Sequence, residues 1–178
     1  KWNADQRMVN VRKHLQLSQA HWDADLLVWP EFALTLYGDD AKQVTDQLQQ
    51  QGQAQQTNII IGMPDLRWLD QSSYQLFNSA QGFGLATGRF AKHHLVPFGD
   101  YVPLQDYLRG LIEFFDLPMS AASRGARQQG NIRLQLTELE QPTQVAIGIC
   151  YEIAYGDMLR RHAISSGLLL TISNDTWF

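Results

Sequence analysis

Cysteine is almost absent from this chain of 178 residues, which contains one, Cys150. A single cysteine excludes an internal disulfide and leaves the redox compartment open. Long apolar runs are also lacking, since none approaches the ~18 residues that a membrane-spanning helix needs. The net charge is −4 and basic residues cluster only in pairs, so we expect no nucleic-acid interface.

The composition is that of an ordinary globular domain. Hydrophobic residues make up 44% of the sequence and charged residues 18%, and we expect one domain with a sizeable core over residues 1–178. The chain starts without a methionine and stops shortly after a predicted strand. We therefore expect it to be a piece of a longer protein, truncated at both ends.

Helical and extended patterns alternate along the chain. Helices are expected over residues 5–21, 39–56, 104–115 and 152–167, and strands over 25–29, 58–62, 74–80, 84–91, 132–136, 145–149 and 168–172. The strands 74–80 and 84–91 are expected to form a hairpin with its turn at 81–83, and residues 116–130 an irregular excursion. This order predicts an α/β layered domain with a mixed sheet, whose strands at both ends of the chain are buried.

The apolar stretch before Cys150 organises the prediction of a site. Val145 to Ile149 predict a strand buried on both faces, and polar residues follow at once. A thiol at such a strand-to-helix bend can stand clear of the sheet, and a helix N-terminus favours the thiolate. Cys150 is therefore a candidate nucleophile. The alternative is an inert core cysteine, the commoner behaviour of a lone thiol.

Two further charged residues directly follow predicted strands. Glu31 comes just after the strand that ends at Trp29, and Lys92 follows the strand that ends at Ala91. Ligands of open α/β sheets bind outside the carboxyl ends of strands, so Glu31 could share a crevice with Cys150 and act as its base. Lys92 is a candidate to hold an oxyanion or a thiolate. Taken singly, each is more simply interpreted as an exposed charged residue.

Three other patterns are set aside. The adjacent His93 and His94 are expected to point apart, and no Cys/His spacing supplies further ligands, so we expect neither a metal nor another cofactor. The glycines at 82, 84 and 88 have the wrong spacing for dinucleotide binding. Asn174 begins a glycosylation-type tripeptide, a pattern with many false positives.

Four segments carry a resemblance to a known family. They are Val28-Trp29-Pro30-Glu31, the stretch from Lys92 to Pro103, Ile149-Cys150-Tyr151-Glu152, and residues 173–178. On these segments the chain resembles the carbon–nitrogen hydrolase (nitrilase) superfamily and, within it, the family of bacterial apolipoprotein N-acyltransferases. The stretch from Lys92 is the most specific, because soluble amidases do not usually carry its Val-Pro-Phe-Gly-acid-Tyr-Val-Pro continuation.

The resemblance assigns a role to each candidate residue. It implies that Glu31 is the general base, Lys92 the oxyanion-stabilising lysine and Cys150 the nucleophile. Asp100 stands where the family usually has a glutamate that supports the catalytic lysine and base, and Glu152 matches an acid with a structural or orienting role. Asp100 is one methylene shorter than that glutamate, which leaves its role open.

The resemblance also implies a fold and a reaction. The fold is a nitrilase-like α-β-β-α sandwich with mixed sheets, incomplete in this chain, and the parent protein has membrane helices on both sides of it. The reaction transfers an acyl chain from a phospholipid, through a cysteine thioester, to the N-terminal diacylglyceryl-cysteine amine of an apolipoprotein. The location is the bacterial inner membrane, with this domain on the periplasmic side.

Other interpretations stay open beside this one. They are a soluble amidase or carbamoylase of the same superfamily, and a non-catalytic binding domain that keeps the fold. If the substrate is a lipid, aromatic side chains could line the mouth of the site, although core packing explains each of them equally well. The candidates are Phe98, Tyr101, Phe114, Phe115 and Trp177.

Overall fold

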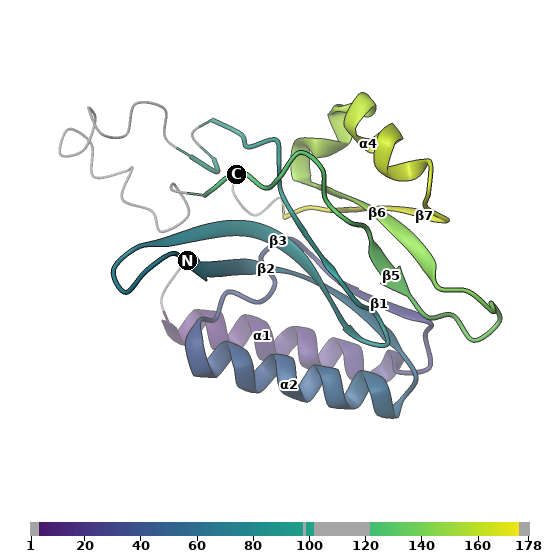
Figure 1. Ribbon diagram of the computed structural model, residues 1–178. Coiled ribbons are helices and arrows are strands. Elements are labelled where there is room, and N and C mark those ends of the chain that lie inside the picture. Colours follow the sequence, from purple (N-terminus) through teal and green to yellow (C-terminus); the bar gives the residue numbers. More distant parts are fainter. Residues whose placement is uncertain (1–3, 98, 102–121, 175–178) are drawn as a thin grey trace, which may run out of the picture.

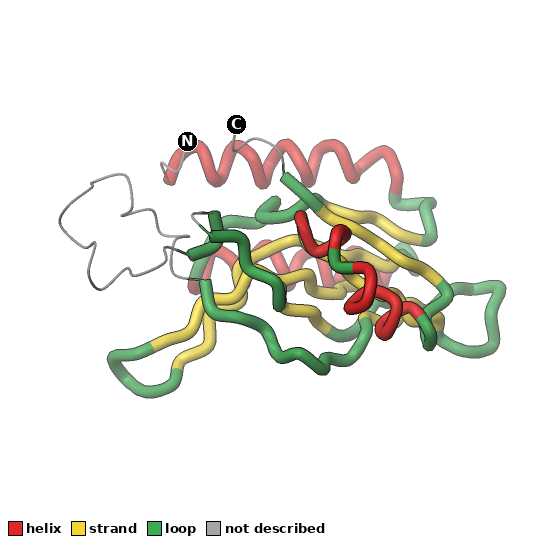
Figure 2. The backbone as a smooth tube through the Cα atoms, turned by 90° about the horizontal axis from the view of Figure 1, so that it is seen from above, coloured by secondary structure: helices red, strands yellow, loops and turns green. Residues whose placement is uncertain are grey.

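The structure is a computed structural model, and it describes residues 4–97, 99–101 and 122–174. This part of the chain forms four layers (Figure 1). Helices α1 (Ala4–Ser18) and α2 (Gly38–Ala54) cover one side of a first sheet, and a second sheet lies on its other side. Helix α4 (Gly156–Ala163) covers the second sheet, as the view from above also shows (Figure 2). The predicted α-β-β-α fold is confirmed.

Both sheets are mixed. In the first sheet the order is β1-β2-β3-β4, with β1 parallel to β2 and the other pairs antiparallel. Its strands are β1 (Leu26–Trp29), β2 (Asn58–Trp68), β3 (Tyr74–Gly84) and β4 (Arg89–Ala91). In the second sheet the central β6 (Thr143–Ile149) is antiparallel to β5 (Ile132–Leu134) and parallel to β7 (Leu168–Ile172).

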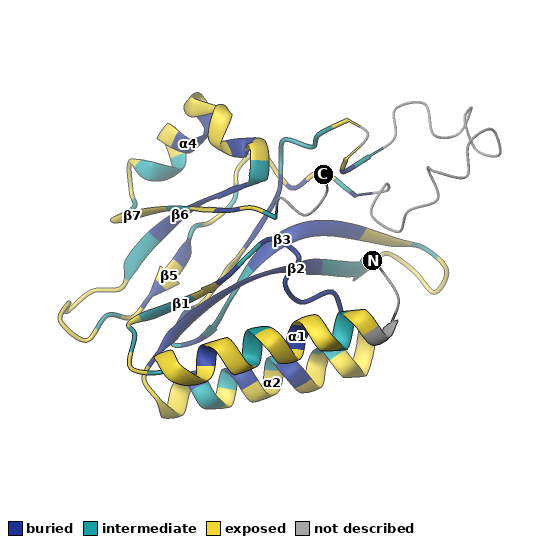
Figure 3. Cartoon of the chain, turned by 180° about the vertical axis from the view of Figure 1, so that it is seen from behind, coloured by how far each residue is buried: buried dark blue, intermediate teal, exposed yellow. Residues whose placement is uncertain are grey.

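Two apolar cores hold the layers together, because β2 is apolar on both faces. Ile59 and Ile61 pack toward the helices, where Val11 and Leu48 are buried beside them. Ile60, between them in the strand, packs toward the second sheet instead. Successive side chains of a strand point to opposite faces, which explains this division. Figure 3 shows the buried strands between helices that are exposed on their outer faces.

The second core lies between the two sheets. Val145, Ile147 and Ile149 of β6 are fully buried in it. On the other face of β6, a Cβ on Gly148 would come within 3.2 Å of Cδ2 of Leu159, so the glycine lets α4 pack closely. The apolar run before Cys150 is thus buried on both faces, as predicted.

Most predicted elements are confirmed, with shifts at their ends. They are the helices over 5–21 and 39–56, the first ending in a 3₁₀ turn (Gln19–His21), and the strands at 25–29, 58–62, 132–136, 145–149 and 168–172.

The prediction that the first and last strands are buried is wrong. Val28 of β1 is 38% exposed and Leu169 of β7 is 47% exposed, since β1 and β7 are outer strands of the described sheets.

The predicted hairpin turn at 81–83 is also wrong. Strand β3 runs through these residues, and Gly82 pairs with Ile60 of β2. A Cβ on Gly82 would lie 3.0 Å from the carbonyl carbon of Ala86. The glycine therefore serves close packing of the turn that follows, and does not itself reverse the chain.

The reversals lie on either side of β3. Between β2 and β3 the Asp70 carboxylate accepts hydrogen bonds from the backbone N–H groups of Ser72 and Ser73, each at 2.8 Å. At the turn from β3 to β4, Gly84 at the end of β3 and Gly88 just before β4 have φ angles of +67° and +101°, which favour glycine.

The predicted helix over 152–167 is interrupted. A 3₁₀ turn covers Cys150–Ala154, and α4 begins only at Gly156. Tyr155 between them has φ −94° and ψ 71°, which breaks the helical path. The predicted helix at 104–115 lies outside the described residues.

Of the predicted irregular excursion at 116–130, residues 122–130 are described. They form neither helix nor strand apart from a single bridge at Ala122. Within the described ranges, no helix has the length and apolarity to cross a bilayer.

Candidate active site

Cys150 lies at the carboxyl end of β6 in an uncommon backbone conformation. Its φ is +57°, in the left-handed region that residues other than glycine rarely adopt. The 3₁₀ turn starts at this residue, and the cysteine is only partly buried. Such conformations persist where the surroundings enforce them, and they are concentrated at functional sites. The sharp turn places the thiol at the end of the sheet.

Glu31 lies just beyond the carboxyl end of β1, and it is 2% exposed. The turn that carries it packs directly on Gly62 of β2. A Cβ on Gly62 would come within 2.3 Å of the carbonyl oxygen of Pro30 and 2.6 Å of Cα of Glu31. Only glycine at this position allows the turn to approach β2 so closely.

Lys92 follows β4 directly, as predicted, and it is also 2% exposed. Its Nζ lies 2.7 Å from Oδ2 of Asp100 and 3.5 Å from Oε1 of Glu31. Asp100 Oδ2 also accepts a hydrogen bond from the backbone N–H of Val96 at 2.8 Å, which fixes the carboxylate. The structure therefore brings Glu31 together with Lys92 and Asp100, which come from one stretch far from Glu31 in the sequence.

Asn78 joins the two carboxylates, and the sequence analysis missed it. Its Nδ2 donates to Oε1 of Glu31 at 2.7 Å and lies 3.4 Å from Oδ1 of Asp100. Its Oδ1 is buried and has no hydrogen-bond partner in the part of the chain that the structure describes. Strand β3 contains several polar residues, so its sequence gave no signal that singles out Asn78.

The carboxyl end of β7 adds two more residues to the site. The backbone N–H of Asn174 donates to Oε2 of Glu31 at 3.2 Å, and Nδ2 of Asn174 donates to the Glu31 carbonyl at 3.1 Å. The side chain of Ser173 lowers the pKa of the Cys150 thiol. The segment of the glycosylation-type tripeptide thus contacts Glu31, although its second and third residues lie outside the described ranges.

The charges of the site act on one another. Burial raises the pKa of Glu31, and the nearby ammonium of Lys92 only partly offsets this. Burial alone would lower the pKa of Lys92, but the carboxylates of Asp100 and Glu31 outweigh it and raise that pKa. Burial and the charge of Glu31 raise the pKa of the Cys150 thiol, while Lys92 lowers it. Glu31, Lys92 and Cys150 therefore form one electrostatic unit.

The direction of the pKa shift of the Cys150 thiol differs from the one that the sequence suggested. The sequence suggested that a helix N-terminus would favour the thiolate, yet α4 starts six residues later and the pKa of the thiol is raised. The resting thiol is therefore largely protonated at neutral pH, and a base is required to activate it.

Glu152 links the turn of the cysteine to the segment of the lysine. It is fully buried, and its Oε1 accepts hydrogen bonds from the backbone N–H groups of His93 at 2.7 Å and His94 at 3.0 Å. Its Oε2 accepts one from the backbone N–H of Ile149 at 3.0 Å. Burial raises its pKa, and these hydrogen bonds oppose the rise. Glu152 thus ties the two segments together, and its structural or orienting role stays a prediction.

The two adjacent histidines do not point apart. Their ring centroids lie 4.8 Å from each other, edge to face. Nδ1 of His93 lies 2.7 Å from the carbonyl oxygen of Gly125, and the ring of His94 stacks on that of Tyr155. Among the described residues, no group of three or more His, Cys, Asp or Glu side chains could hold a metal ion.

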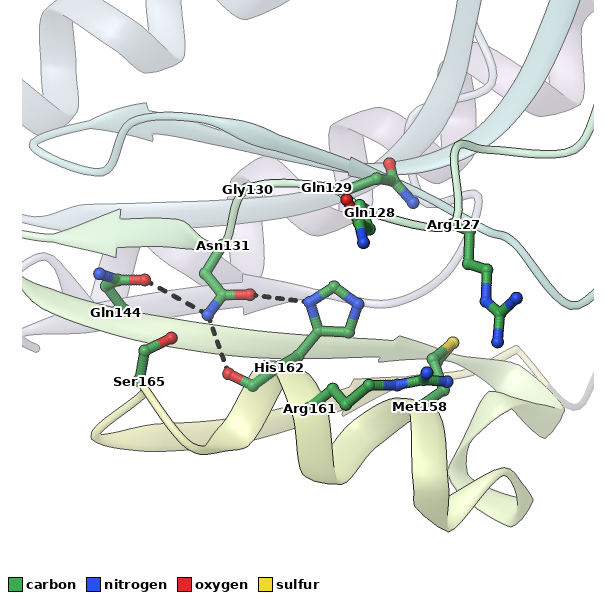
Figure 4. Close-up of a pocket in the computed structure, with 10 residues that line it drawn as sticks. All are labelled: Arg127, Gln128, Gln129, Gly130, Asn131, Gln144, Met158, Arg161, His162 and Ser165. Carbon is green, nitrogen blue, oxygen red and sulfur yellow. Dashed lines mark hydrogen bonds between the residues drawn. The ribbon is translucent and has the colours of Figure 1, made fainter.

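A cavity of about 430 Å³ lies between α4 and the segment before β5 (Figure 4). Its lining residues are mostly polar, and they include Arg127, Gln129, Asn131, Arg161 and His162. None of Glu31, Lys92 and Cys150 lines it. The cavity is therefore distinct from the buried charges at the strand ends, which we take as the candidate active site because they have the reactive groups.

Sequence similarity assigns this fold to one family of enzymes. A model of the carbon–nitrogen hydrolase family matches residues 1–178, and the chain belongs to this family. Among curated proteins it is 39% identical over 178 residues to an apolipoprotein N-acyltransferase of Pseudomonas aeruginosa, covering 100% of this chain and 34% of that protein. To the enzyme of Vibrio parahaemolyticus it is 33% identical over 188 residues, covering 100% of this chain and 35% of that protein. The chain thus spans about a third of these relatives.

Solved structures share the fold at low identity. The NitFhit protein of C. elegans superposes with a TM-score of 0.62 at 11% identity, covering 96% of this chain and 40% of that one. A carbon–nitrogen hydrolase from Helicobacter pylori gives 0.59 at 16% identity, covering 94% and 53%. These likenesses establish the architecture.

Proposed function

We propose that this chain is the catalytic domain of an apolipoprotein N-acyltransferase. The proposed reaction moves an acyl chain from a phospholipid to the N-terminal amine of a diacylglyceryl-cysteine apolipoprotein, in lipoprotein maturation. The observation that carries the proposal is the buried contact of the Glu31 carboxylate with the Lys92 ammonium, 3.5 Å apart, in an electrostatic unit with the Cys150 thiol. The 39% identity over all 178 residues of this chain to a curated enzyme of that name, of which it covers 34%, supports the choice of reaction.

The first half-reaction acylates the cysteine. Glu31 takes the proton of the Cys150 thiol while the sulfur attacks the ester carbonyl carbon of the phospholipid. Lys92 holds the negative charge that develops on the carbonyl oxygen. The intermediate collapses as the ester C–O bond breaks, and Glu31 returns its proton to the departing oxygen. Lysophospholipid leaves, and the acyl chain stays on Cys150 as a thioester.

The second half-reaction transfers the acyl chain to an amine. The neutral α-amino group of the apolipoprotein attacks the thioester carbonyl, and Glu31 accepts the proton that the nitrogen loses. The C–S bond then breaks, the proton passes to the sulfur, and the free thiol is restored. The product is an amide, and the two substrates react in turn, so we expect ping-pong kinetics.

The environment of each group supports these roles. The raised pKa of Glu31 makes it a stronger base than an exposed glutamate, and a thiol with a raised pKa needs such a base. Asp100 holds Lys92 at 2.7 Å and keeps it positively charged. Loss of one donor to an oxyanion typically costs about 3–4 kcal/mol in the barrier.

The substrates also suggest where the reaction takes place. A phospholipid donor and a lipid-bearing acceptor require access to a bilayer, and we propose that the parent protein lies in the bacterial inner membrane with this domain on the periplasmic side. Tyr101 is the one member of the proposed aromatic mouth among the described residues, and it is half-buried. The other four lie outside those residues.

The proposal is tested by asking which acceptor receives the acyl group. Full-length protein is incubated with radiolabelled phospholipid and a diacylglyceryl-cysteine peptide, and the products are separated. We expect labelled N-acyl peptide, and none from the Cys150→Ala variant. Release of free fatty acid without N-acyl peptide would favour the hydrolase alternative. A Cys150 that no thiol-directed reagent modifies, with no product of either kind, would favour a binding domain.

A further inference from the structure

The segment of residues 122–129, which we call the edge strap, runs along the open side of the first sheet. Strand β4 is the last strand of that sheet, so one edge of its backbone has no strand beside it among the described residues. The edge strap starts beside β3, where the backbone N–H of Ser123 donates to the carbonyl of Leu76 at 2.6 Å. In Figure 1 it belongs to the green segment that leads into β5.

Gln129 pairs with the open edge of β4 through its side-chain amide. Its Oε1 accepts the backbone N–H of Ala91 at 2.9 Å, and its Nε2 donates to the Ala91 carbonyl at 2.7 Å. One amide thus satisfies both polar groups of the residue immediately before Lys92. Because Ala91 is buried, losing this pair would leave two backbone groups without partners.

Gly125 forms a backbone hydrogen bond with Lys92, the residue that follows Ala91. Its backbone N–H donates to the carbonyl of Lys92 at 2.9 Å, and its own carbonyl oxygen lies 2.7 Å from Nδ1 of His93. A Cβ on Gly125 would come within 2.2 Å of the carbonyl oxygen of Ala91. This contact is with backbone, so any larger residue must push the edge strap and β4 apart.

The main chain of Lys92 is therefore held from two sides. On one side its N–H donates to the carbonyl of Asn78 in β3 at 2.8 Å, and on the other its C=O accepts from Gly125. We propose that Gln129 and Gly125 are positioning residues for the Lys92 ammonium, because they lock the backbone that carries it. The inference rests on the proposed function, in which Lys92 stabilises the oxyanion.

The chain supplies a matched control for each position. Gln128 is an exposed glutamine that lines the cavity of Figure 4, as Gln129 does. No hydrogen bond of its side chain is found in the described structure. Gln128 and Gln129 lie side by side in Figure 4. Gly130 has no atom within 4 Å of a Cβ built on it, and its φ is not in the left-handed region.

The experiment compares Gln129→Ala and Gly125→Ala with Gln128→Ala and Gly130→Ala in the full-length protein. Steady-state transfer gives kcat and KM, and the alkylation of Cys150 by iodoacetamide is followed against pH. Because displacement of a catalytic group by ~1 Å can cost up to ~10²-fold, we expect kcat to fall by about ten- to a hundredfold with KM within about twofold. The alkylation profile should move to higher pH, as it should in a Lys92→Gln reference. Both controls should match the wild type.

Two outcomes overturn the inference and are distinguishable. If Gln129→Ala lowers the melting temperature but leaves kcat and the alkylation profile unchanged, the edge strap is only structural. If Lys92→Gln itself changes neither kcat nor the profile, the proposed role of the lysine fails first, and the positioning role fails with it. If the Gly125→Ala variant does not fold, the result for Gln129→Ala alone decides whether the edge strap positions Lys92.

Discussion

The ammonium of Lys92 lies 2.7 Å from Oδ2 of Asp100. It lies 3.5 Å from Oε1 of Glu31, so its closer contact is with the carboxylate that we do not propose as the base. Asp100 is therefore the nearer counter-ion of Lys92, and its own negative charge raises the pKa of Glu31, which favours proton acceptance by Glu31. The one-methylene difference from the glutamate expected at position 100 does not prevent this contact.

Removing the charge of Asp100 should impair the reaction without removing a reacting group. In Asp100→Asn, Lys92 loses its nearest counter-ion and pairs more tightly with Glu31, which weakens the base. We expect kcat for N-acyl transfer to fall by about tenfold to a hundredfold, because the base is weakened but not removed and its full contribution is typically ~10²–10⁴-fold. Asp100→Glu restores the charge and should recover most of the activity. Equal losses in the two variants would show that the charge is not what matters.

The pH dependence of Cys150 alkylation should report both neighbouring charges. Only the thiolate reacts, and the pKa of the thiol is raised, so half-maximal alkylation should lie at a higher pH than for free cysteine. Lys92→Gln removes a stabilising positive charge and should move the profile to still higher pH. Glu31→Gln removes a negative charge and should move it to lower pH.

Mass spectrometry of the Cys150 peptide measures this reaction whatever other cysteines the parent protein has. Lys42 serves as a control, because it is an exposed lysine of α2, and Lys42→Gln should leave the profile unchanged. A shift of the same sign in Lys92→Gln and Glu31→Gln would contradict the electrostatic account.

Glu152 should matter for stability and activity together. Glu152→Gln keeps the volume but turns one of the two acceptor oxygens into a donor, so an N–H among those of Ile149, His93 and His94 loses its partner. We expect a loss of about 1–3 kcal/mol in the free energy of unfolding, measured by denaturant titration, and a lower kcat. Unchanged stability would mean that the three hydrogen bonds contribute little.

A methyl group on Gly62 should displace the catalytic turn. The Cβ in Gly62→Ala would meet the backbone of Pro30 and Glu31 at 2.3 Å and 2.6 Å, and neither can yield without moving the Glu31 carboxylate. We expect a loss of transfer activity of about a hundredfold at substrate saturation. Gly156→Ala is the matched control, since no atom lies within 4 Å of a Cβ there, and it should stay active.

The sequence allowed much of this architecture to be predicted, for physical reasons. Helical periodicity located α1 and α2, and short apolar runs located β2 and β6. Glu31, Lys92 and Cys150 could be singled out because each follows a strand at its carboxyl end, where ligands of layered α/β proteins bind. Their candidate roles followed from these positions, the resemblance assigned one role to each, and those roles stay predictions.

The missed features depend on contacts between distant segments. Asn78 matters because the register of β3 places it between Glu31 and Asp100, and no local sequence pattern indicates this contact. Gln129 lies in a segment without helix or strand, so periodicity says nothing of its pairing with Ala91. The false turn at 81–83 arose because glycine also marks close packing.

The central claim is that the acyl chain rests on Cys150 during transfer. In the most direct measurement, the full-length protein is incubated with phospholipid alone, and the mass of the Cys150 peptide is determined by mass spectrometry. We predict a mass increase of one acyl group, removed by hydroxylamine or by the diacylglyceryl-cysteine peptide, absent in Cys150→Ala and formed about 10²–10³-fold more slowly in Lys92→Ala. An acyl group trapped on the Cys150→Ala protein, or N-acyl peptide formed by it at the wild-type rate, would contradict the account.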